Sequence, residues 1–305
     1  MKVVITGGAG FIGYYVVRFL RSKNFNVLVY DSFMRAFNEL KYLKKLGVNV
    51  WRGDIRSFSG FLEMLKRFKP DVIVHLAAFV DVGESLRKPL SYFRNNALGT
   101  AVVAEACRRV GVEKVVYASS AAVYGEPRYL PIDEEHPAEP LSPYGLSKLV
   151  GELVLRQYAR NYGLKVTVLR LFNVYGSGQN PAYAGVISRF IERAIAGKPL
   201  IIYGDGLQTR DFVHVGDVAE AFYKAIVGNV TGVFNIASGK PVRIIDLARM
   251  IGEIVGGKVK IRYAPPRRGD IRHSYASIEK ARRELRWEPR RRLKEELRKM
   301  LSLTK

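Results

Sequence analysis

The eight residues TGGAGFIG, at positions 6–13, constrain the fold of this chain more than any other stretch. They follow a strand-like run, VVIT (3–6), and open an apolar stretch with helical periodicity. A glycine-rich turn between a strand and a helix is typical of a βαβ unit that binds a dinucleotide. Gly7 permits the tight turn, Gly10 lets the backbone approach a pyrophosphate, and Gly13 allows close helix–strand packing. The turn therefore predicts an anion site at the N-terminus of the first helix.

An acidic residue stands where a dinucleotide-binding unit needs one. Asp31 follows the second strand-like run, VLVY (27–30), and lies 18 residues beyond Gly13. A carboxylate there accepts hydrogen bonds from ribose hydroxyls and repels a 2′-phosphate, so the sequence favours NAD over NADP. Arg35 lies close by and leaves a contact with a 2′-phosphate open.

Strand-like and helical patterns alternate through the first 172 residues. The β-branched runs lie at 3–6, 27–30, 48–51, 71–76, 114–119 and 166–172, and the helical patterns near 58–68, 91–109 and 144–162. This alternation predicts an α/β fold of the Rossmann type, with a doubly wound parallel sheet covered by helices on both faces. Asp54 and Ile55, which follow the third strand-like run, are expected to flank the adenine.

The regular alternation ends near Phe172, and short strands, loops and helices follow. We therefore expect an NAD-binding Rossmann domain over 1–172, with a return segment near 210–236. Residues 173–305 are expected to form a smaller, mixed α/β region that covers the substrate.

Composition excludes several classes of protein. No apolar run approaches the length of a membrane span, and the N-terminus lacks the longer apolar region and cleavage site of a signal peptide, so we expect a cytoplasmic protein. Cys107 is the only cysteine, which precludes an intrachain disulfide. The four histidines lack metal-ligand spacing, so no metal site is expected: His75, His136, His214 and His273.

The net charge of +22 is unusual for a chain of 305 residues. Such a field attracts nucleic acid, acidic membrane surfaces or phosphorylated small molecules. Much of the charge lies in the last forty residues, including RRRLKEELRK (290–299), where a solvated basic helix face is the favoured interpretation.

The segment SPYGLSK (142–148) places a phenol and an ammonium one helical turn apart. Pro143 suits the first position of a helix, and from that start Tyr144 and Lys148 fall on one face. An ammonium beside a phenol favours the phenolate, so we expect the pKa of Tyr144 to fall below its usual value of about 10. Taken alone, the pair fits a surface helix as well as an acid/base site.

With both patterns present, the chain resembles the extended short-chain dehydrogenase/reductase family of NAD-dependent epimerases and dehydratases. Within that family it is most similar to the UDP-glucose (UDP-galactose) 4-epimerases. The motifs that carry the resemblance beyond TGGAGFIG are HLAA (75–78), VGESLRKPLSYFRNNALGT (82–100), SSAAVYG (119–125), YGLSK (144–148), LRLFNVYG (169–176) and RDFVHVGDV (210–218).

The resemblance implies roles for the residues around these motifs. Ser120 would hydrogen-bond the sugar 4-hydroxyl, Tyr144 would act as its base, and Lys148 would hold the nicotinamide ribose and keep Tyr144 acidic. The implied NAD-binding residues are Gly7, Gly10, Phe11, Ile12, Gly13, Asp31, Asp54, Ile55, Leu76, Ala77, Ala78, Asn95, Tyr144 and Lys148.

Two alanines in SSAAVYG bear on the reaction type. Family members that dehydrate a nucleotide sugar carry acidic side chains at the positions of Ala121 and Ala122, and decarboxylating members carry a glutamate at the second. Alanine can neither give nor take a proton. The resemblance therefore implies an isomerase that inverts C4 of a UDP-sugar through a transient 4-keto intermediate, with NAD regenerated in each cycle.

The second half would bind the nucleotide. Asn173, Arg210 and Arg267 resemble the diphosphate contacts of the family, and Asp270 the contact to the nucleotide ribose. Tyr203 and the segment 184–187, which includes Val186, would cover the base, although the chain is shorter here than many relatives. Ser274 would border the C2 substituent of the sugar and leave room for an N-acetyl group.

Two other functions and one assembly remain to be weighed. The chain could be a 4-epimerase of a UDP-uronic acid or a UDP-N-acetylhexosamine, or a catalytically silent, NAD-sensing protein that binds nucleic acid. The presence of Ser120, Tyr144 and Lys148 argues against a catalytically silent protein. The lack of a nucleic-acid-binding motif argues against binding to nucleic acid. The resemblance also implies a homodimer built on helices 91–109 and 144–162, whose apolar faces offer Ala97, Leu98, Ala101, Val102, Ala104, Leu149, Leu153, Val154 and Tyr158.

Overall fold

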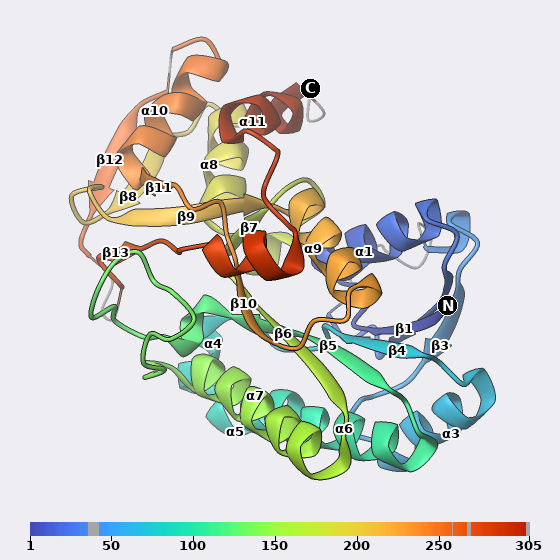
Figure 1. Cartoon of the computed structure of the whole chain (residues 1–305). Coiled ribbons are helices and arrows are strands. Elements are labelled where there is room, and N and C mark those ends of the chain that lie inside the picture. The colour runs from blue at the N-terminus through green and yellow to red at the C-terminus, as the bar shows by residue number, and fades with distance from the viewer. Residues whose placement is uncertain (36–42, 258, 267–269, 303–305) are drawn as a thin grey trace.

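A seven-stranded parallel sheet forms the centre of the molecule (Figure 1). The structure is a computed structural model and describes residues 1–35, 43–257, 259–266 and 270–302. The strand order is β10-β6-β5-β4-β1-β2-β3, with bounds β1 Lys2–Thr6, β2 Asn26–Asp31, β3 Asn49–Arg52, β4 Val72–His75, β5 Lys114–Ser120, β6 Lys165–Leu171 and β10 Gly232–Ile236. The predicted α/β Rossmann-type fold is confirmed.

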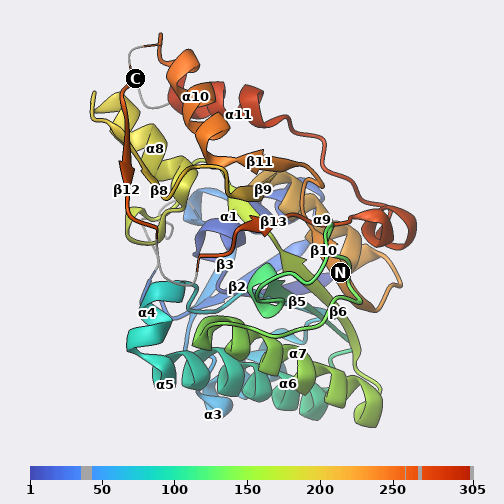
Figure 2. The same ribbon diagram turned by 90° about the vertical axis from the view of Figure 1, so that its left-hand side faces the viewer.

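Helices cover both faces of this sheet, which explains its apolar strands. One face carries α1 (Phe11–Ser22) and α9 (Val215–Val227), which pack on each other, and the other carries α3 (Phe58–Phe68), α6 (Gly99–Val110) and α7 (Pro143–Tyr162). Figure 2 shows the same two sets of helices from the side. Each set of helices buries its own apolar cluster against the sheet.

The helix predicted near 91–109 is present, but its first part is not a regular α-helix. The short helices α4 (Val82–Arg87) and α5 (Pro89–Tyr92) run into a π-helical stretch, Phe93–Leu98, before α6 begins. The next helix, α7, begins at Pro143 as predicted, and the Ser142 side chain caps it by accepting from Gly145 N at 3.1 Å. This cap sets the start of the face that carries Tyr144 and Lys148.

A second layer lies beyond the carboxyl ends of the parallel strands (Figure 1). A four-stranded sheet contains β7 (Asn173–Tyr175), β9 (Thr209–His214), β11 (Pro241–Arg243) and β13 (His273–Ser274). A two-stranded sheet pairs β8 (Leu200–Tyr203) with β12 (Ile261–Ala264), and α8 (Val186–Ile195), α10 (Ile244–Ile254) and α11 (Leu293–Ser302) pack around a separate apolar cluster. From β9 the chain runs through α9 to β10 and so returns to the large sheet. The second layer is therefore joined to the large sheet more than once.

The faces of α6 and α7 carry exposed apolar side chains. Leu98, which directly precedes α6, is 54% exposed, and Leu153, on α7, is 43% exposed, although both helices already cover the sheet. Ala104, which the sequence assigned to the same outer face, is fully buried between α6 and the sheet, so that assignment was wrong. Among the helices that the described residues form, none combines the length and apolar character needed to cross a bilayer.

Candidate active site

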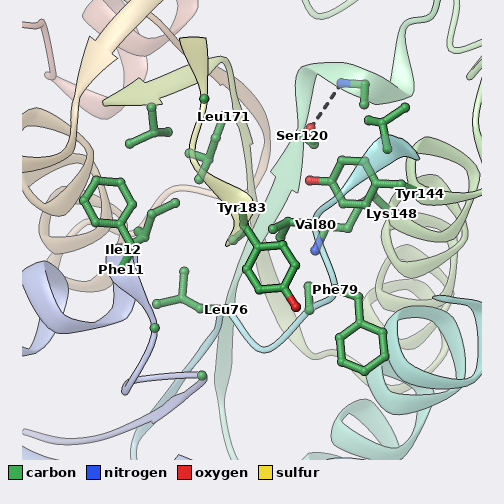
Figure 3. A pocket seen from close by; sticks show the side chains of 18 of the residues that line it. Phe11, Ile12, Leu76, Phe79, Val80, Ser120, Tyr144, Lys148, Leu171 and Tyr183 are labelled. Carbon is green, nitrogen blue, oxygen red and sulfur yellow. Dashed lines mark hydrogen bonds between the residues drawn. The ribbon is translucent and has the colours of Figure 1, made fainter. Parts of the chain in front are cut away.

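A cavity of about 880 Å³ lies between the carboxyl ends of the parallel strands and the second layer (Figure 3). Every residue that the resemblance assigned to NAD lines it. The lining residues assigned to the sugar nucleotide are Ser120, Tyr144, Asn173, Val186, Arg210, Asp270 and Ser274. The fold therefore gathers residues from both halves of the chain around one space.

Two of the assigned residues do not join this set. Tyr203 does not line the cavity, because it ends β8, where its strand pairs with β12 in the outer two-stranded sheet. The prediction that Tyr203 covers the base is therefore not supported by its position. Arg267 lies outside the described residues.

The glycine turn at the end of β1 has the geometry that its sequence predicts. Gly7 adopts a φ of +70°, and a Cβ there would lie 2.7 Å from the backbone nitrogen of Ala77. A Cβ on Gly13 would collide with the carbonyl oxygen of Gly7, so the helix could not pack as closely on the turn. Among the described residues, no side chain caps the N-terminus of α1 and no acid lies in its first turn. These features fit the pyrophosphate of a dinucleotide.

Asp31 is held at the end of β2, one strand away from the glycine turn. Its carboxylate accepts hydrogen bonds from Ala9 N at 3.0 Å and Phe33 N at 2.8 Å. Burial nevertheless raises the pKa of this carboxyl above its ordinary value. Asp31 is thus fixed beside the space where a ribose would lie, which fits NAD.

Arg35, the residue that left NADP open, has another partner. Its guanidinium forms an ion pair with Glu84 at 2.8 Å and lies over the ring of Phe79, 3.6 Å from the ring centroid. The ion pair occupies Nη2 of Arg35. Asp54, expected beside the adenine, lines the cavity while its carboxylate accepts from Arg56 Nε at 2.9 and 3.0 Å, which lowers the pKa of Asp54.

The catalytic candidates meet where β5 ends and α7 begins. Ser120 is the last residue of β5, and its Oγ accepts from Ala122 N at 3.2 Å. In Figure 3 the hydroxyl of Tyr144 points toward Ser120, while the Lys148 ammonium lies on the other side of the tyrosine ring.

Since β4 and β1 separate β5 from β2, Ser120 and Asp31 stand about 14 Å apart, at about 4.8 Å per strand. An extended dinucleotide spans that distance.

Burial changes the acid/base properties of this pair. The pKa of Tyr144 is raised above its usual value by burial, against which the hydrogen bond with Ser120 acts in part. Burial also lowers the pKa of Lys148 to about 7, although nearby Glu152 raises it. The expectation that the pKa of Tyr144 falls below its usual value is therefore wrong for the protein alone, because burial raises it.

A buried ion pair that was not foreseen from the sequence supports the catalytic pair. Glu152 lies one turn beyond Lys148 on α7 and accepts from Arg170 Nε at 3.0 Å and Nη2 at 2.7 Å. Its carboxylate also accepts from the hydroxyl of Ser119, the neighbour of Ser120. The spacing of Tyr144, Lys148 and Glu152, four residues apart each time, was the available signal.

The wall beside Ser120 has no acidic lining residue. Among the described residues that line the cavity, the acids are Asp31, Asp54 and Asp270. None of them belongs to β5, α7 or the loop between them. Ala121 and Ala122, the positions at which the resemblance implies acidic side chains in dehydrating relatives, line the cavity.

The opposite wall is formed by β7, β9 and β13. Arg210 forms an ion pair with Asp270 and donates from Nη1 to its own neighbour, Thr209 O, at 2.8 Å. Ser274 is the register partner of Arg210 across β9 and β13 and lines the cavity. Asn173 Nδ2 donates to Asp211 O at 3.1 Å. Residues far apart in the sequence thus form one polar wall.

Comparisons with known proteins agree with this arrangement. A model of the NAD dependent epimerase/dehydratase family matches residues 3–237. The UDP-glucose 4-epimerase of Lacticaseibacillus casei is 35% identical, over 95% of this chain and 92% of its own. The solved UDP-glucose 4-epimerase of Thermotoga maritima with UDP-glucose is 35% identical, with a TM-score of 0.95 and coverage of 100% of this chain and 98% of its own. A UDP-N-acetylglucosamine 4-epimerase of Methanobrevibacter ruminantium, solved in complex with UDP-N-acetylmuramic acid, is 33% identical, with a TM-score of 0.93 and coverage of 99% and 97%.

Proposed function

The chain belongs to the NAD dependent epimerase/dehydratase family, and from this premise we propose that it is a UDP-glucose/UDP-galactose 4-epimerase. NAD is the cofactor, and the sugar nucleotide lies across the cavity with its C4 next to Ser120 and Tyr144. The proposal uses one space for both molecules, as the two sets of lining residues require.

One observation carries the choice of reaction. Tyr144 and Ser120 stand beside the reacting centre without an acidic lining neighbour on that wall. Dehydration and decarboxylation need a second group that moves a proton or stabilises charge next to C4. With Ala121 and Ala122 there, the chemistry is confined to oxidation and reduction at C4, which is what a 4-epimerase performs.

The residues perform the proton transfers of this reaction. Ser120 orients the sugar 4-hydroxyl and Tyr144, as phenolate, takes its proton while C4 loses a hydride. NAD, when bound, supplies the group that accepts this hydride and returns it. The 4-keto sugar then turns over, and Tyr144 gives the proton back as the hydride reaches the opposite face of C4. In this proposal the Lys148 ammonium, together with the positive charge of NAD when it is bound, favours the phenolate, whereas burial in the protein alone raises the pKa of Tyr144.

The second layer supplies the nucleotide contacts. We assign Arg210 and Asn173 to the diphosphate and Asp270 to the nucleotide ribose, with Val186 beside the base, because all four line the cavity. Arginine suits a diphosphate, since its planar fork donates two parallel hydrogen bonds. In this scheme the diphosphate replaces Asp270 as the partner of Arg210. Residues 1–172 with 210–236 then hold the cofactor, and most of 173–305 holds the sugar nucleotide.

The sugar pocket also suits a second class of substrate. Ser274 lines the cavity on β13 and is small and polar, so an acetamide at C2 of the sugar has room beside it. The relative from Methanobrevibacter ruminantium acts on UDP-N-acetylglucosamine, which supports this extension. We therefore propose that UDP-N-acetylhexosamines are accepted in addition to UDP-glucose.

A panel assay tests the reaction. Purified protein is incubated separately with UDP-glucose, UDP-N-acetylglucosamine and UDP-glucuronic acid, and each mixture is analysed for the 4-epimer. We expect UDP-galactose from the first and the N-acetylated epimer from the second. Conversion of the uronic acid alone would replace the proposal with the uronate epimerase, and a dehydrated or decarboxylated product would overturn it.

We propose that the enzyme is a homodimer that works in the cytoplasm, without nucleic acid or membrane as a partner. The exposed side chains of Leu98 and Leu153 on neighbouring helices support a self-complementary interface, because a monomer rarely leaves such a face in water. Light scattering at micromolar concentration tests the assembly, and the mass of a monomer would contradict it.

A further inference from the structure

Arg35 connects three segments that are far apart in the sequence. It follows β2, whereas Phe79 and Glu84 follow β4 and Tyr183 follows β7. The guanidinium forms an ion pair with Glu84 at 2.8 Å, and its carbon lies 3.6 Å from the ring centroid of Phe79 and 5.0 Å from that of Tyr183. We refer to Arg35, Phe79, Glu84 and Tyr183 as the Arg35 clamp.

The side of the clamp that follows β4 is firmly anchored. Phe79 N donates to Asn96 Oδ1 at 2.8 Å, and Asn96 Nδ2 donates to Phe79 O and to Ser147 Oγ, both at 2.9 Å. The hydroxyl of Tyr92 donates to Glu84 Oε2 at 2.9 Å. Because Ser147 lies on α7, this side of the clamp is tied to the helix that carries Tyr144 and Lys148.

The side that follows β7 has hydrogen bonds of its own, including one from the hydroxyl of Tyr15 to Ser177 O at 3.0 Å. Asn180 Nδ2 donates to the carbonyl of Arg35 at 3.4 Å, and its Oδ1 accepts from Ala182 N at 3.0 Å, which caps the short turn ending at Tyr183. Figure 3 shows the ring of Tyr183 at the cavity. This segment therefore contacts Arg35 in two ways, through the side chain of Asn180 and through the ring of Tyr183.

Sheet topology places the clamp over the glycine turn. β2 and β4 lie on either side of β1, so their ends are about 10 Å apart with the turn between them. The contact of Arg35 with Phe79 and Glu84 therefore bridges the end of β1. A dinucleotide seated on the glycine turn would lie beneath that bridge, since Arg35, Phe79 and Tyr183 all line the cavity.

We propose that the Arg35 clamp closes over the bound dinucleotide and sets the rate at which it leaves the protein. This inference rests on the proposed function, because it takes NAD as the ligand of the glycine turn. Nη1 of Arg35 is buried and has no acceptor among the described residues. An oxygen of the bound dinucleotide is the acceptor that satisfies this donor, so ligand and clamp hold each other in place.

The clamp is tested by the rate of NAD release in the absence of any sugar nucleotide. Protein loaded with NAD is diluted into an excess of a scavenging NAD-binding protein, and the dinucleotide that remains bound is measured over time. Arg35→Met removes the charge and keeps an apolar stem, and Tyr183→Ala removes the ring. We expect either change to raise the release rate about tenfold, whereas Tyr183→Phe, which keeps the ring under the cation, changes it less than about twofold.

Arg67 provides a matched control. It also forms an ion pair, with Glu63 at 2.6 Å, and lies over an aromatic ring, that of Trp51 at 5.6 Å, but it does not line the cavity. Arg67→Met should leave the release rate unchanged. Equal rates in the parent, Arg35→Met and Tyr183→Ala would overturn the clamp and leave the proposed function intact. A parent protein that binds no NAD would overturn both.

Discussion

The two walls of the cavity bind their polar groups in different ways. The catalytic wall comprises Ser120, Tyr144 and Lys148, and the substrate wall comprises Arg210, Asp270 and Ser274. Lys148 is 3% exposed and lies over the ring of Tyr117, with the buried pair of Glu152 and Arg170 nearby, whereas the side chain of Asp270 is 36% exposed. The charges of the catalytic wall are therefore dry, whereas the charge of Asp270 on the substrate wall is open to solvent.

This difference separates chemistry from recognition. On the dry wall, burial moves the pKa of Tyr144 up and that of Lys148 down, because charged forms lose their solvent. On the open wall, water competes for the Asp270 carboxylate, whereas the side chain of its partner Arg210 is only 16% exposed. A pair of that kind can be exchanged for a diphosphate at little cost. In the proposed function, the buried groups therefore transfer protons and the more exposed groups bind the variable part of the substrate.

Removing the base of the catalytic wall gives the largest expected effect. Tyr144→Phe keeps the ring but cannot take the proton of the sugar hydroxyl, so we expect turnover to fall by about 10²–10⁴-fold. NAD binding should be preserved. Tyr158→Phe, which removes a hydroxyl on α7 that donates to Glu105 on α6, is the control and should retain activity. Near-parental turnover of Tyr144→Phe would show that another group is the base.

Removing the buried Glu152 carboxylate behind the catalytic wall should destabilise the protein more than removing a similar carboxylate at the surface. Glu152→Gln leaves the buried Arg170 charge without its partner, so the free energy of unfolding should fall by about 3–5 kcal/mol. Glu105→Gln breaks a comparable set of bonds to Arg108 and Arg109 on exposed helix surface, where about 1 kcal/mol or less is expected. Urea denaturation measures both. Equal losses would remove the distinction between dry and open charge pairs.

The buried lysine should make stability depend on pH. The pKa of Lys148 is about 7 in the folded protein because of burial, against about 10.4 in an unfolded chain. Between these values the unfolded state binds the extra proton, so stability rises with pH. From pH 7 to 9 this residue should add about 2 kcal/mol to the free energy of unfolding.

Chemical denaturation of the NAD-free protein at several pH values measures this contribution. Lys148→Met carries no ionisable group at the position, so its stability should rise less over the same range than that of the parent. Identical slopes for the two proteins would mean that Lys148 is not desolvated as its burial indicates.

The smallest expected effect is a change of preference on the substrate wall. Ser274→Tyr fills the space beside the C2 substituent, so the ratio of activities on UDP-N-acetylglucosamine and UDP-glucose should fall about tenfold. Ser274→Ala keeps the space and should preserve the ratio. Competition between the two substrates in one reaction gives the ratio directly, and an unchanged value for Ser274→Tyr would show that the residue does not border that substituent.

Local patterns in the sequence were sufficient for part of this site. The turn at Gly7 and Gly13 and the shared face of Tyr144 and Lys148 depend on residues within a few positions of each other. The backbone of one turn or one helix therefore specifies them wherever the segment lies. The same holds for the alternation of strands and helices, which predicted the parallel sheet.

Contacts between distant segments determined the rest. The sequence left a contact of Arg35 with a 2′-phosphate open, but the partner of Arg35 in the structure is Glu84. Tyr203 was expected to cover the base, but it ends β8, which pairs with β12, and it does not line the cavity. Spacing also predicted a lower pKa for Tyr144, whereas burial raises it. Burial and long-range pairing arise from how all the elements pack together. No short stretch of sequence contains that information, so the protonation of the catalytic wall and the closure over the dinucleotide are properties of the tertiary structure alone.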